Sequence, residues 1–192
     1  RMRWNWIFDL PFGKGRRFLN SLGPLDRVVS GWQITGLYTL QSGTPVGVMT
    51  PTNLTGTYNA VTDVYGSYSP NSRPNNNGQS AKLSGDPKSR LNRWFNTSVF
   101  SQPAAFTYGT APRTLPDVRW HGTNNLDFGF FKNNKFGNDG RFNLQFRAEF
   151  FNVANHARFG VAGMQYGTAP FGVISSQANN PRQAQLALKL NY

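Results

Sequence analysis

The stretch QAQLALKLNY, residues 183–192, decides the fold. Its even-numbered positions carry apolar side chains that end in Tyr192, and its odd-numbered positions carry mostly polar ones. Because successive side chains of a β-strand point to opposite faces, this segment has an apolar face and a polar face. We therefore predict a strand that borders an apolar environment on one side and ends in an aromatic residue.

The same alternation recurs upstream, in 2–10, 31–42, 123–136 and 141–152. It is most regular in 141–152, where apolar side chains from Phe142 to Phe150 alternate with polar ones. The sequence Gly-Asn-Asp-Gly, 137–140, favours a hairpin, because these residues accept the positive φ angles of a tight reversal. The pattern predicts an all-β chain with about five long antiparallel strands.

The connections carry predictions of their own. We expect 46–122 to be a large loop with some structure, because a structureless loop of this length is unusual. Within the loops, small strands or pieces folded onto the loop are expected at 94–100 and 104–108, and extensions of the flanking strands at 159–164 and 171–175. A short helical turn is expected around Phe18, Leu19 and Leu22, ended by Gly23 and Pro24.

Composition excludes several functional classes. The chain has 20 Lys and Arg residues against 8 acidic ones, a net charge of +12, but they are scattered and build no continuous basic stripe for nucleic acid. Cysteine is absent, which excludes disulfides, thiolate catalysis and cysteine-based zinc sites. No run of 18 apolar residues is present, which excludes a transmembrane helix and leaves transmembrane strands open.

Alternation alone does not separate a membrane barrel from a soluble sandwich, but three further features favour transmembrane β-barrel strands. The predicted strands are 9 to 14 residues long, and a tilted strand needs roughly 9–11 residues to cross a bilayer. Long and short connections alternate. If the carboxyl end is periplasmic, the turn 137–140 is periplasmic and the loops 46–122 and 153–181 are extracellular. The connection between the first two strands is then unusually long for a periplasmic turn.

The charged positions predict which face meets lipid. Turning 141–152 inside out would bring Arg side chains toward lipid at roughly 2–4 kcal/mol each near the midplane, and would leave large apolar side chains in water at about 1.5–3 kcal/mol each. The predicted lumen-facing residues are Arg141, Gln145, Arg147, Glu149, Gln185 and Lys189. The predicted lipid-facing or girdle residues are Trp4, Trp6, Trp32, Phe142, Phe146, Phe150, Leu188 and Tyr192. Trp32, Phe142 and Tyr192 lie at predicted periplasmic ends, where interfacial rings gather.

Five strands do not close a barrel, since the smallest single-chain outer-membrane barrels have about eight. An open sheet with one apolar face and two bare edges would aggregate. The chain also begins directly in a strand-like pattern, without a charged leader or a hydrophobic signal core. We therefore expect an incomplete barrel, the carboxy-terminal fragment of a longer protein whose further strands lie upstream.

Several segments resemble the late barrel strands of TonB-dependent receptors, most closely the Oar-like branch with a carboxypeptidase-regulatory-like domain. The resembling segments are DLPFGKG at 9–15, GWQI at 31–34, QSGTP at 41–45, RTLP at 113–116, 124–132 and, above all, RAEFFNVANH at 147–156. The resemblance spans nearly the whole chain. It implies that 1–192 is the carboxy-terminal segment of a barrel of about 22 strands in the outer membrane of a Gram-negative bacterium.

The resemblance also implies partners. A plug domain, which 1–192 does not contain, lies upstream and is moved by the TonB complex to import a ligand. The expected partners are the TonB complex through that plug, the barrel-assembly machinery through the last strand, membrane lipid and an unidentified imported ligand. Nucleic acid is not an expected partner. No family-wide ligand residues transfer to positions of this sequence.

Chemistry-bearing motifs are few. His121 and His156 are the only histidines and lack a third ligand at a recognisable spacing, so we expect two surface loop residues and no metal site. Arg147 and Glu149 either line a transport pathway or contact a plug, or they are ordinary solvated lumen residues, and we favour the latter. With no serine elbow, catalytic carboxylate pair, phosphate loop or HExxH motif, we expect no enzyme, no catalytic residue and no cofactor.

Two other functions remain open from the sequence. In one, the barrel has a structural or adhesion role and displays the loop 46–122 without transporting anything. In the other, the chain is a soluble basic β protein that binds DNA in a salt-dependent manner. A plug with a TonB box upstream favours import, and its absence favours display.

Overall fold

A computed structural model describes residues 1–19, 21, 23–51 and 72–192. The chain divides into two compact units. The sheet unit comprises Arg1–Gln41, Thr123–Ala157 and Asn179–Tyr192. The loop unit comprises Ser42–Gly122 and Arg158–Ala178. Within the described part of the chain, no helix has the length and apolarity needed to span a bilayer.

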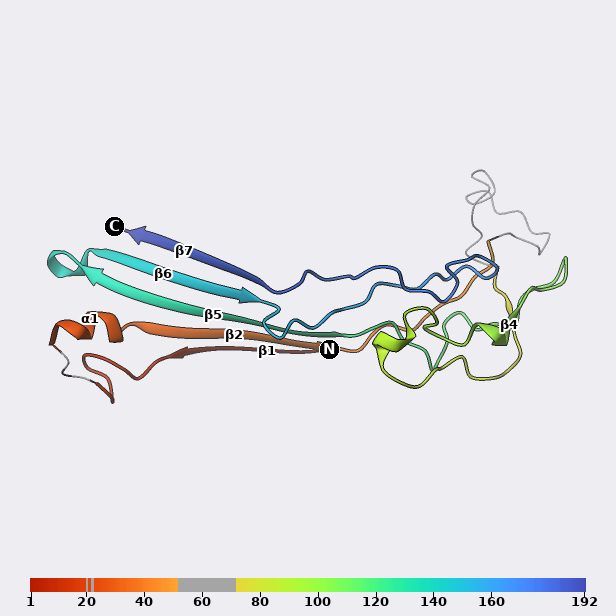
Figure 1. Cartoon of the computed structure of the whole chain (residues 1–192), viewed down its shortest axis with the longest axis horizontal. Coiled ribbons are helices and arrows are strands. Elements are labelled where there is room, and N and C mark those ends of the chain that lie inside the picture. Colours follow the sequence, from red (N-terminus) through yellow and green to blue (C-terminus); the bar gives the residue numbers. More distant parts are fainter. Residues whose placement is uncertain (20, 22, 52–71) are drawn as a thin grey trace. The chain divides into compact units, whose positions relative to one another are not determined.

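The sheet unit is an open antiparallel sheet of five long strands in the order β1-β2-β5-β6-β7 (Figure 1). The strands are β1 Met2–Asp9, β2 Trp32–Gln41, β5 Thr123–Phe136, β6 Phe142–Phe151 and β7 Gln183–Asn191. The predicted all-β fold and its five strands are confirmed, with the ends of four strands shifted by one or two residues. Among the described residues, β1 and β7 are each paired along one side only.

The register aligns apolar residues in rows on one side of the sheet and polar residues in rows on the other. Trp4, Tyr38 and Leu126 lie opposite one another across β1, β2 and β5, and Phe146 lies opposite Leu188 across β6 and β7. We call this side the apolar face: it carries the even-numbered positions of the five strands, from Met2 to Leu190. The polar face carries the odd-numbered positions, from Arg3 to Asn191.

The β1–β2 and β5–β6 connections and the carboxyl end share one end of the sheet (Figure 1). The β5–β6 turn is a 3-10 turn, Asn138–Gly140, in which Asp139 has a φ of 61°, as the predicted tight reversal requires. The β1–β2 connection holds a 3-10 turn η1, Gly23–Leu25, and a helix α1, Asp26–Val29. The predicted helical turn around Phe18 and Leu19 is wrong, and Leu22 lies outside the described residues. The helical turns begin where Gly23 and Pro24 were expected to end them, because proline fits the first turn of a helix.

The loop unit has its own hydrophobic core, which confirms that the described part of 46–122, residues 46–51 and 72–122, is a loop with structure; 52–71 lie outside the described residues. Phe95 and Leu115 are among its fully buried side chains. The core residues are Val46, Val48, Ala81, Trp94, Phe95, Val99, Phe100, Ala111, Leu115, Val118, Ala162 and Ile174. Regular elements are short: β3 Asn75–Asn76 pairs with β4 Phe100–Ser101, and the 3-10 turns are η3 Pro87–Arg90 and η4 Thr97–Val99.

Two predictions for the loops are wrong. The segment 104–108 forms a turn closed by the Thr107 N–H to the Ala104 carbonyl, with Phe106 81% exposed, and it is no strand. The segments 159–164 and 171–175 do not continue β6 and β7. They belong to the loop unit, where isolated bridges join them and Ala162 and Ile174 enter its core, because burying apolar side chains there outweighs a longer ladder.

Candidate functional site

A hydrogen-bonded network runs across the middle of the polar face. The Arg147 Nε donates to Gln145 Oε1 at 2.6 Å, and the Gln145 Nε2 donates to Asn133 Oδ1 at 2.8 Å. The Asn143 amide also donates to Asn133 Oδ1, at 3.3 Å. The Arg147 guanidinium lies 5.4 Å from the ring centre of Phe131, so the one aromatic residue that breaks the alternation of β5 supports a polar-face cation.

The structure brings five of the six predicted lumen-facing residues together on this face. Gln145 lies directly opposite Lys189, Glu149 lies opposite Gln185, and Arg147 lies between the two pairs on β6. Arg141 is the exception, because it precedes β6 and its guanidinium lies 6.0 Å from the ring centre of Phe142. Whether this face borders a lumen stays a prediction at this point.

Asp127 anchors the exit of β6, a role that the sequence did not suggest. Its carboxylate accepts the Asn125 side-chain amide at 2.9 Å and the backbone N–H of Asn152 at 2.9 Å. Asn152 has a φ of 50° and is buried, and its own Oδ1 accepts the backbone N–H of His156 at 3.0 Å. Asn tolerates this left-handed conformation better than most residues, which was the available sequence signal.

The predicted lipid-facing residues occupy the apolar face, and several are widely exposed. Trp4 is 61% exposed, Leu188 is 70% exposed and Tyr192, one residue beyond β7, is 92% exposed. The remaining members in the same rows are Trp6, Trp32, Phe142, Phe146 and Phe150. Trp6 lies against Gly36, where a Cβ would come within 2.0 Å of the Trp6 ring, so only glycine admits the indole at this place.

Lys132 is a charged residue in the register of the apolar face, opposite Trp32 and Phe146. It is 6% exposed, because its Nζ donates to the Arg27 carbonyl at 2.7 Å and also to the Ser30 carbonyl. The Trp32 Nε1 donates to the Val28 carbonyl at 2.8 Å. Strand side chains therefore hold the α1 turn in place by its backbone carbonyls, and the sequence signal for this was the one lysine in an apolar row.

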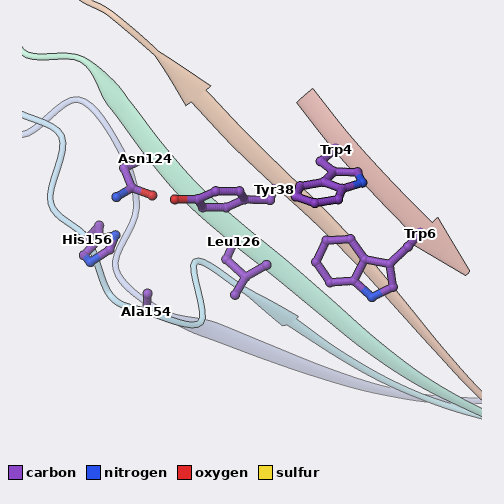
Figure 2. Close-up of a pocket in the computed structure, with 7 residues that line it drawn as sticks. All are labelled: Trp4, Trp6, Tyr38, Asn124, Leu126, Ala154 and His156. Atoms are coloured by element: carbon purple, nitrogen blue, oxygen red, sulfur yellow. The ribbon is translucent and has the colours of Figure 1, made fainter. Parts of the chain in front are cut away.

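A hollow of about 620 Å³ opens on the apolar face near the end from which the long loops leave. We call it the aromatic hollow; its lining residues are Trp4, Trp6, Tyr38, Asn124, Leu126, Ala154 and His156. Figure 2 shows the rings of Trp4, Trp6 and Tyr38 on one side, Ala154 and His156 on the other and Leu126 between them. The hydroxyl end of Tyr38 points toward Asn124. The alternation predicted both Trp residues in the apolar row, but it did not predict the hollow.

The two histidines have different surroundings. His156 is exposed, as expected, whereas His121 is half-buried in the loop unit, so its prediction as a plain surface residue is wrong. The His121 ring lies 4.8 Å from the ring centre of Phe159 and 6.1 Å from that of Trp94. Burial, followed by repulsion from Arg158 and Arg90, lowers the pKa of His121, although a hydrogen bond to the Gly122 backbone acts in the opposite direction. Among the described residues, no group of three or more His, Cys, Asp and Glu side chains is placed to hold a metal ion.

The fold and the two faces define a class of protein, a β-sheet built to separate an apolar from a polar environment. Residues 1–185 match the family model described as outer membrane beta barrel domain. Because the match covers nearly the whole chain, the chain belongs to this family and is a protein of the Gram-negative outer membrane. Comparison with curated proteins and with solved structures found no match.

Proposed function

We propose that the chain is the carboxy-terminal part of the barrel of a TonB-dependent receptor that imports a ligand across the outer membrane. In this proposal the apolar face contacts lipid and the polar face lines the lumen. The observation that carries it is the pairing of a continuous apolar face with a hydrogen-bonded polar face on strands long enough to cross a bilayer.

Energetics support this orientation. On β7 alone, Leu186, Leu188 and Leu190 are 69%, 70% and 53% exposed. Each would lose about 1.5–3 kcal/mol in water relative to an apolar environment, so a soluble sheet of this kind would aggregate. Hydrocarbon removes that cost, while the charged positions Arg147 and Glu149 stay in an aqueous lumen.

Closure of the barrel requires further strands. The outer edges of β1 and β7 carry backbone groups that must be paired inside a membrane, because lipid offers them no hydrogen-bond partner. We propose that strands outside the described chain pair with both edges, and that a plug domain fills the lumen and contacts the TonB complex. The protein acts as a receptor and transporter, neither as an enzyme nor as a nucleic-acid-binding protein, and the barrel-assembly machinery inserts it through β7.

The resemblance of 9–15, 31–34 and 147–156 to TonB-dependent receptors is what favours import over the other functions of outer-membrane barrels. The loop unit, with a core of its own, supports the same reading, since a folded extracellular unit can present a binding surface. The ligand itself follows from none of these residues.

The test is a comparison of two mutant strains of the source bacterium. One lacks the full-length protein, and the other carries it with its TonB-contacting segment deleted. Import predicts that both strains grow poorly on the same scarce nutrient, such as a chelated metal or a glycan, at concentrations where the parent grows. If the uncoupled strain grows like the parent on every nutrient that the null strain fails to use, TonB-coupled import is wrong.

A second candidate is display of the loop unit in a structural or adhesion role, and its independent core favours this candidate. Display predicts that removing the loop unit abolishes attachment to surfaces or to other cells while loss of TonB coupling has no effect. A third strain that lacks only the loop unit, compared with the TonB-uncoupled strain, therefore distinguishes the two functions.

A further inference from the structure

We propose that the aromatic hollow binds one acyl chain of the glycolipid of the outer leaflet, the acylated and phosphorylated glucosamine lipid, and that its polar rim faces the sugar phosphate. This rests on the orientation of the apolar face in the proposed function. The hollow would hold one specific lipid molecule for a long time, whereas the lipids around any barrel exchange freely.

Position along the strands places the hollow at the level of the outer leaflet. The opposite end of the apolar face is marked by the stacked rings of Phe136 and Phe142, 5.4 Å apart, with Tyr192 in the next row. On β5, Leu126 in the hollow is ten residues from Phe136. At about 3.4 Å per residue and a tilt of 35–45°, this is about 24–28 Å across the membrane, which matches an apolar band about 25 Å tall.

The lining suits an extended hydrocarbon chain. Trp4, Trp6 and Tyr38 form a wall of flat rings, and Leu126 forms the floor (Figure 2). The 2.0 Å approach that a Cβ at Gly36 would make to the Trp6 ring shows how closely this wall is set against the strand. The volume of about 620 Å³ lies within the roughly 300–1,000 Å³ of small-molecule pockets.

The rim is polar, and side-chain amides of two asparagines hold its backbone in place. The Asn152 Nδ2 donates to the carbonyls of His156 at 3.3 Å and Asn180 at 3.1 Å, and the Asn179 Nδ2 donates to the His156 carbonyl at 2.9 Å. His156 is thereby fixed beside the hollow. A fixed rim lowers the ordering cost of binding, which is a property of a site more than of a lipid-contacting surface in general.

The polar residues at and next to the rim suit a phosphate group. Arg182 is exposed, and its backbone N–H donates to Asn155 Oδ1 at 3.1 Å, which ties it to the same turn as His156. The Tyr38 hydroxyl end and the Asn124 amide add uncharged hydrogen-bonding groups (Figure 2). Neutral hydrogen-bonding groups at the rim, with an arginine whose backbone is tied to the neighbouring turn, suit a phosphorylated sugar.

The test measures lipid retention by the full-length protein purified in detergent. The protein is incubated with hexa-acylated, bis-phosphorylated lipid A, or with phosphatidylglycerol at the same concentration, and the lipid that remains bound is counted by native mass spectrometry. We expect one lipid A molecule to persist where phosphatidylglycerol is stripped. Trp4→Ala should lower lipid A retention by about tenfold, the effect of removing a central aromatic contact.

Two further variants keep the result interpretable. Ala154→Trp fills the hollow from an exposed turn and should lower retention to a similar degree without truncating a strand residue. Phe8→Ala removes an aromatic residue from the same strand and face outside the hollow, and should retain lipid A like the wild type. Equal retention by Ala154→Trp and Phe8→Ala, or equal retention of both lipids by the wild type, would overturn the site.

A separate crosslinking experiment tests whether the apolar face contacts lipid. A photo-crosslinking amino acid at Leu188, at the other end of the apolar face, should react with any bilayer lipid if this face meets hydrocarbon. Crosslinking at Leu188 without selective retention of lipid A refutes the hollow alone. Absence of crosslinking refutes the orientation on which the proposed function rests, and the hollow with it.

Discussion

Lys132 shows how one residue departs from the pattern of its strand for a structural reason. Its register places it among the aromatic residues of the apolar face, but its Nζ donates to carbonyls of Arg27 and Ser30 at the end of α1. Unpaired backbone carbonyls near the bilayer interface are costly, and a lysine can cap them from a neighbouring strand. The Lys132 ammonium also lies 5.9 Å from the ring centre of Trp32. The long β1–β2 connection is thereby held to the sheet.

Replacing Lys132 by Met should loosen this connection. Methionine keeps the length and apolar stem but leaves two carbonyls without their donor, at a cost of about 1–3 kcal/mol, so trypsin should cleave after Arg27 about fivefold faster or more. The measurement is the rate of that cleavage in the purified full-length barrel. Lys135→Met, at an exposed position of the same strand, is the control and should be cleaved like the wild type. Wild-type protection in Lys132→Met would refute the clamp.

His121 gives the loop unit a dependence on pH. Because its pKa is lowered in the folded state, the folded unit binds fewer protons than the unfolded chain as the pH falls below the ordinary value of 6.5. Its stabilising effect is therefore complete above pH 6.5 and is lost as the pH falls through the lowered pKa.

We expect the tryptophan fluorescence of the full-length protein, to which Trp94 contributes, to report loosening of the loop unit as the pH falls below about 6.5. His121→Gln should flatten this response, whereas His156→Gln, at an exposed position of the sheet unit, should leave it unchanged. A wild-type pH response in His121→Gln would show that another group causes it.

At the scale of the elements, the strands were predictable because lipid and water enforce a strict period of two. β5 has the bounds that its alternation predicted, and β7 differs by one residue. The loop unit was not predictable in detail. Its core gathers Val46, Phe95 and Ile174 from distant segments without a period, so only tertiary contacts define it. The 3-10 turn at Gly23 was missed for a related reason, since glycine and proline are read both as helix starts and as helix ends.

The candidate site was likewise predictable only in part. The alternation predicted which residues share a face, including Trp4, Arg147 and Leu188. It did not predict Asn133 as the acceptor shared by two side-chain amides, nor the hollow beside Tyr38, because both depend on the register between strands that are far apart in sequence.

The end of β7 provides a prediction about assembly. Tyr192 is 92% exposed at the end of the apolar row of β7. An Asp near the interface costs only about 0–1 kcal/mol in a finished barrel, so a stability loss alone would be small. If the barrel-assembly machinery recognises the last strand, as we propose, Tyr192→Asp should sharply lower the amount of full-length protein in the outer membrane. Asn191→Asp places the same charge on the polar face and is the control. Equal surface amounts of both variants would contradict a role for Tyr192 in assembly.

The whole molecule is organised by the separation of its two faces. A sheet with Trp4 and Leu188 exposed on one side and a network around Asn133 on the other suits a position between hydrocarbon and water. The proposed transport role and the proposed lipid site both depend on this sidedness. The family is shown by the match itself, whereas the other two stand or fall with the orientation.

The most direct test is a nitroxide scan of β6, which pairs with a neighbour on both sides. The chain has no cysteine, so single cysteines can be introduced from Gln145 to Phe150 in the full-length protein, with any cysteines elsewhere replaced. In reconstituted bilayers, we predict that positions 146, 148 and 150 are relaxed by oxygen dissolved in the lipid and positions 145, 147 and 149 by a water-soluble nickel complex. The opposite alternation, or no alternation, would contradict the claim that the apolar face contacts lipid and the polar face contacts water.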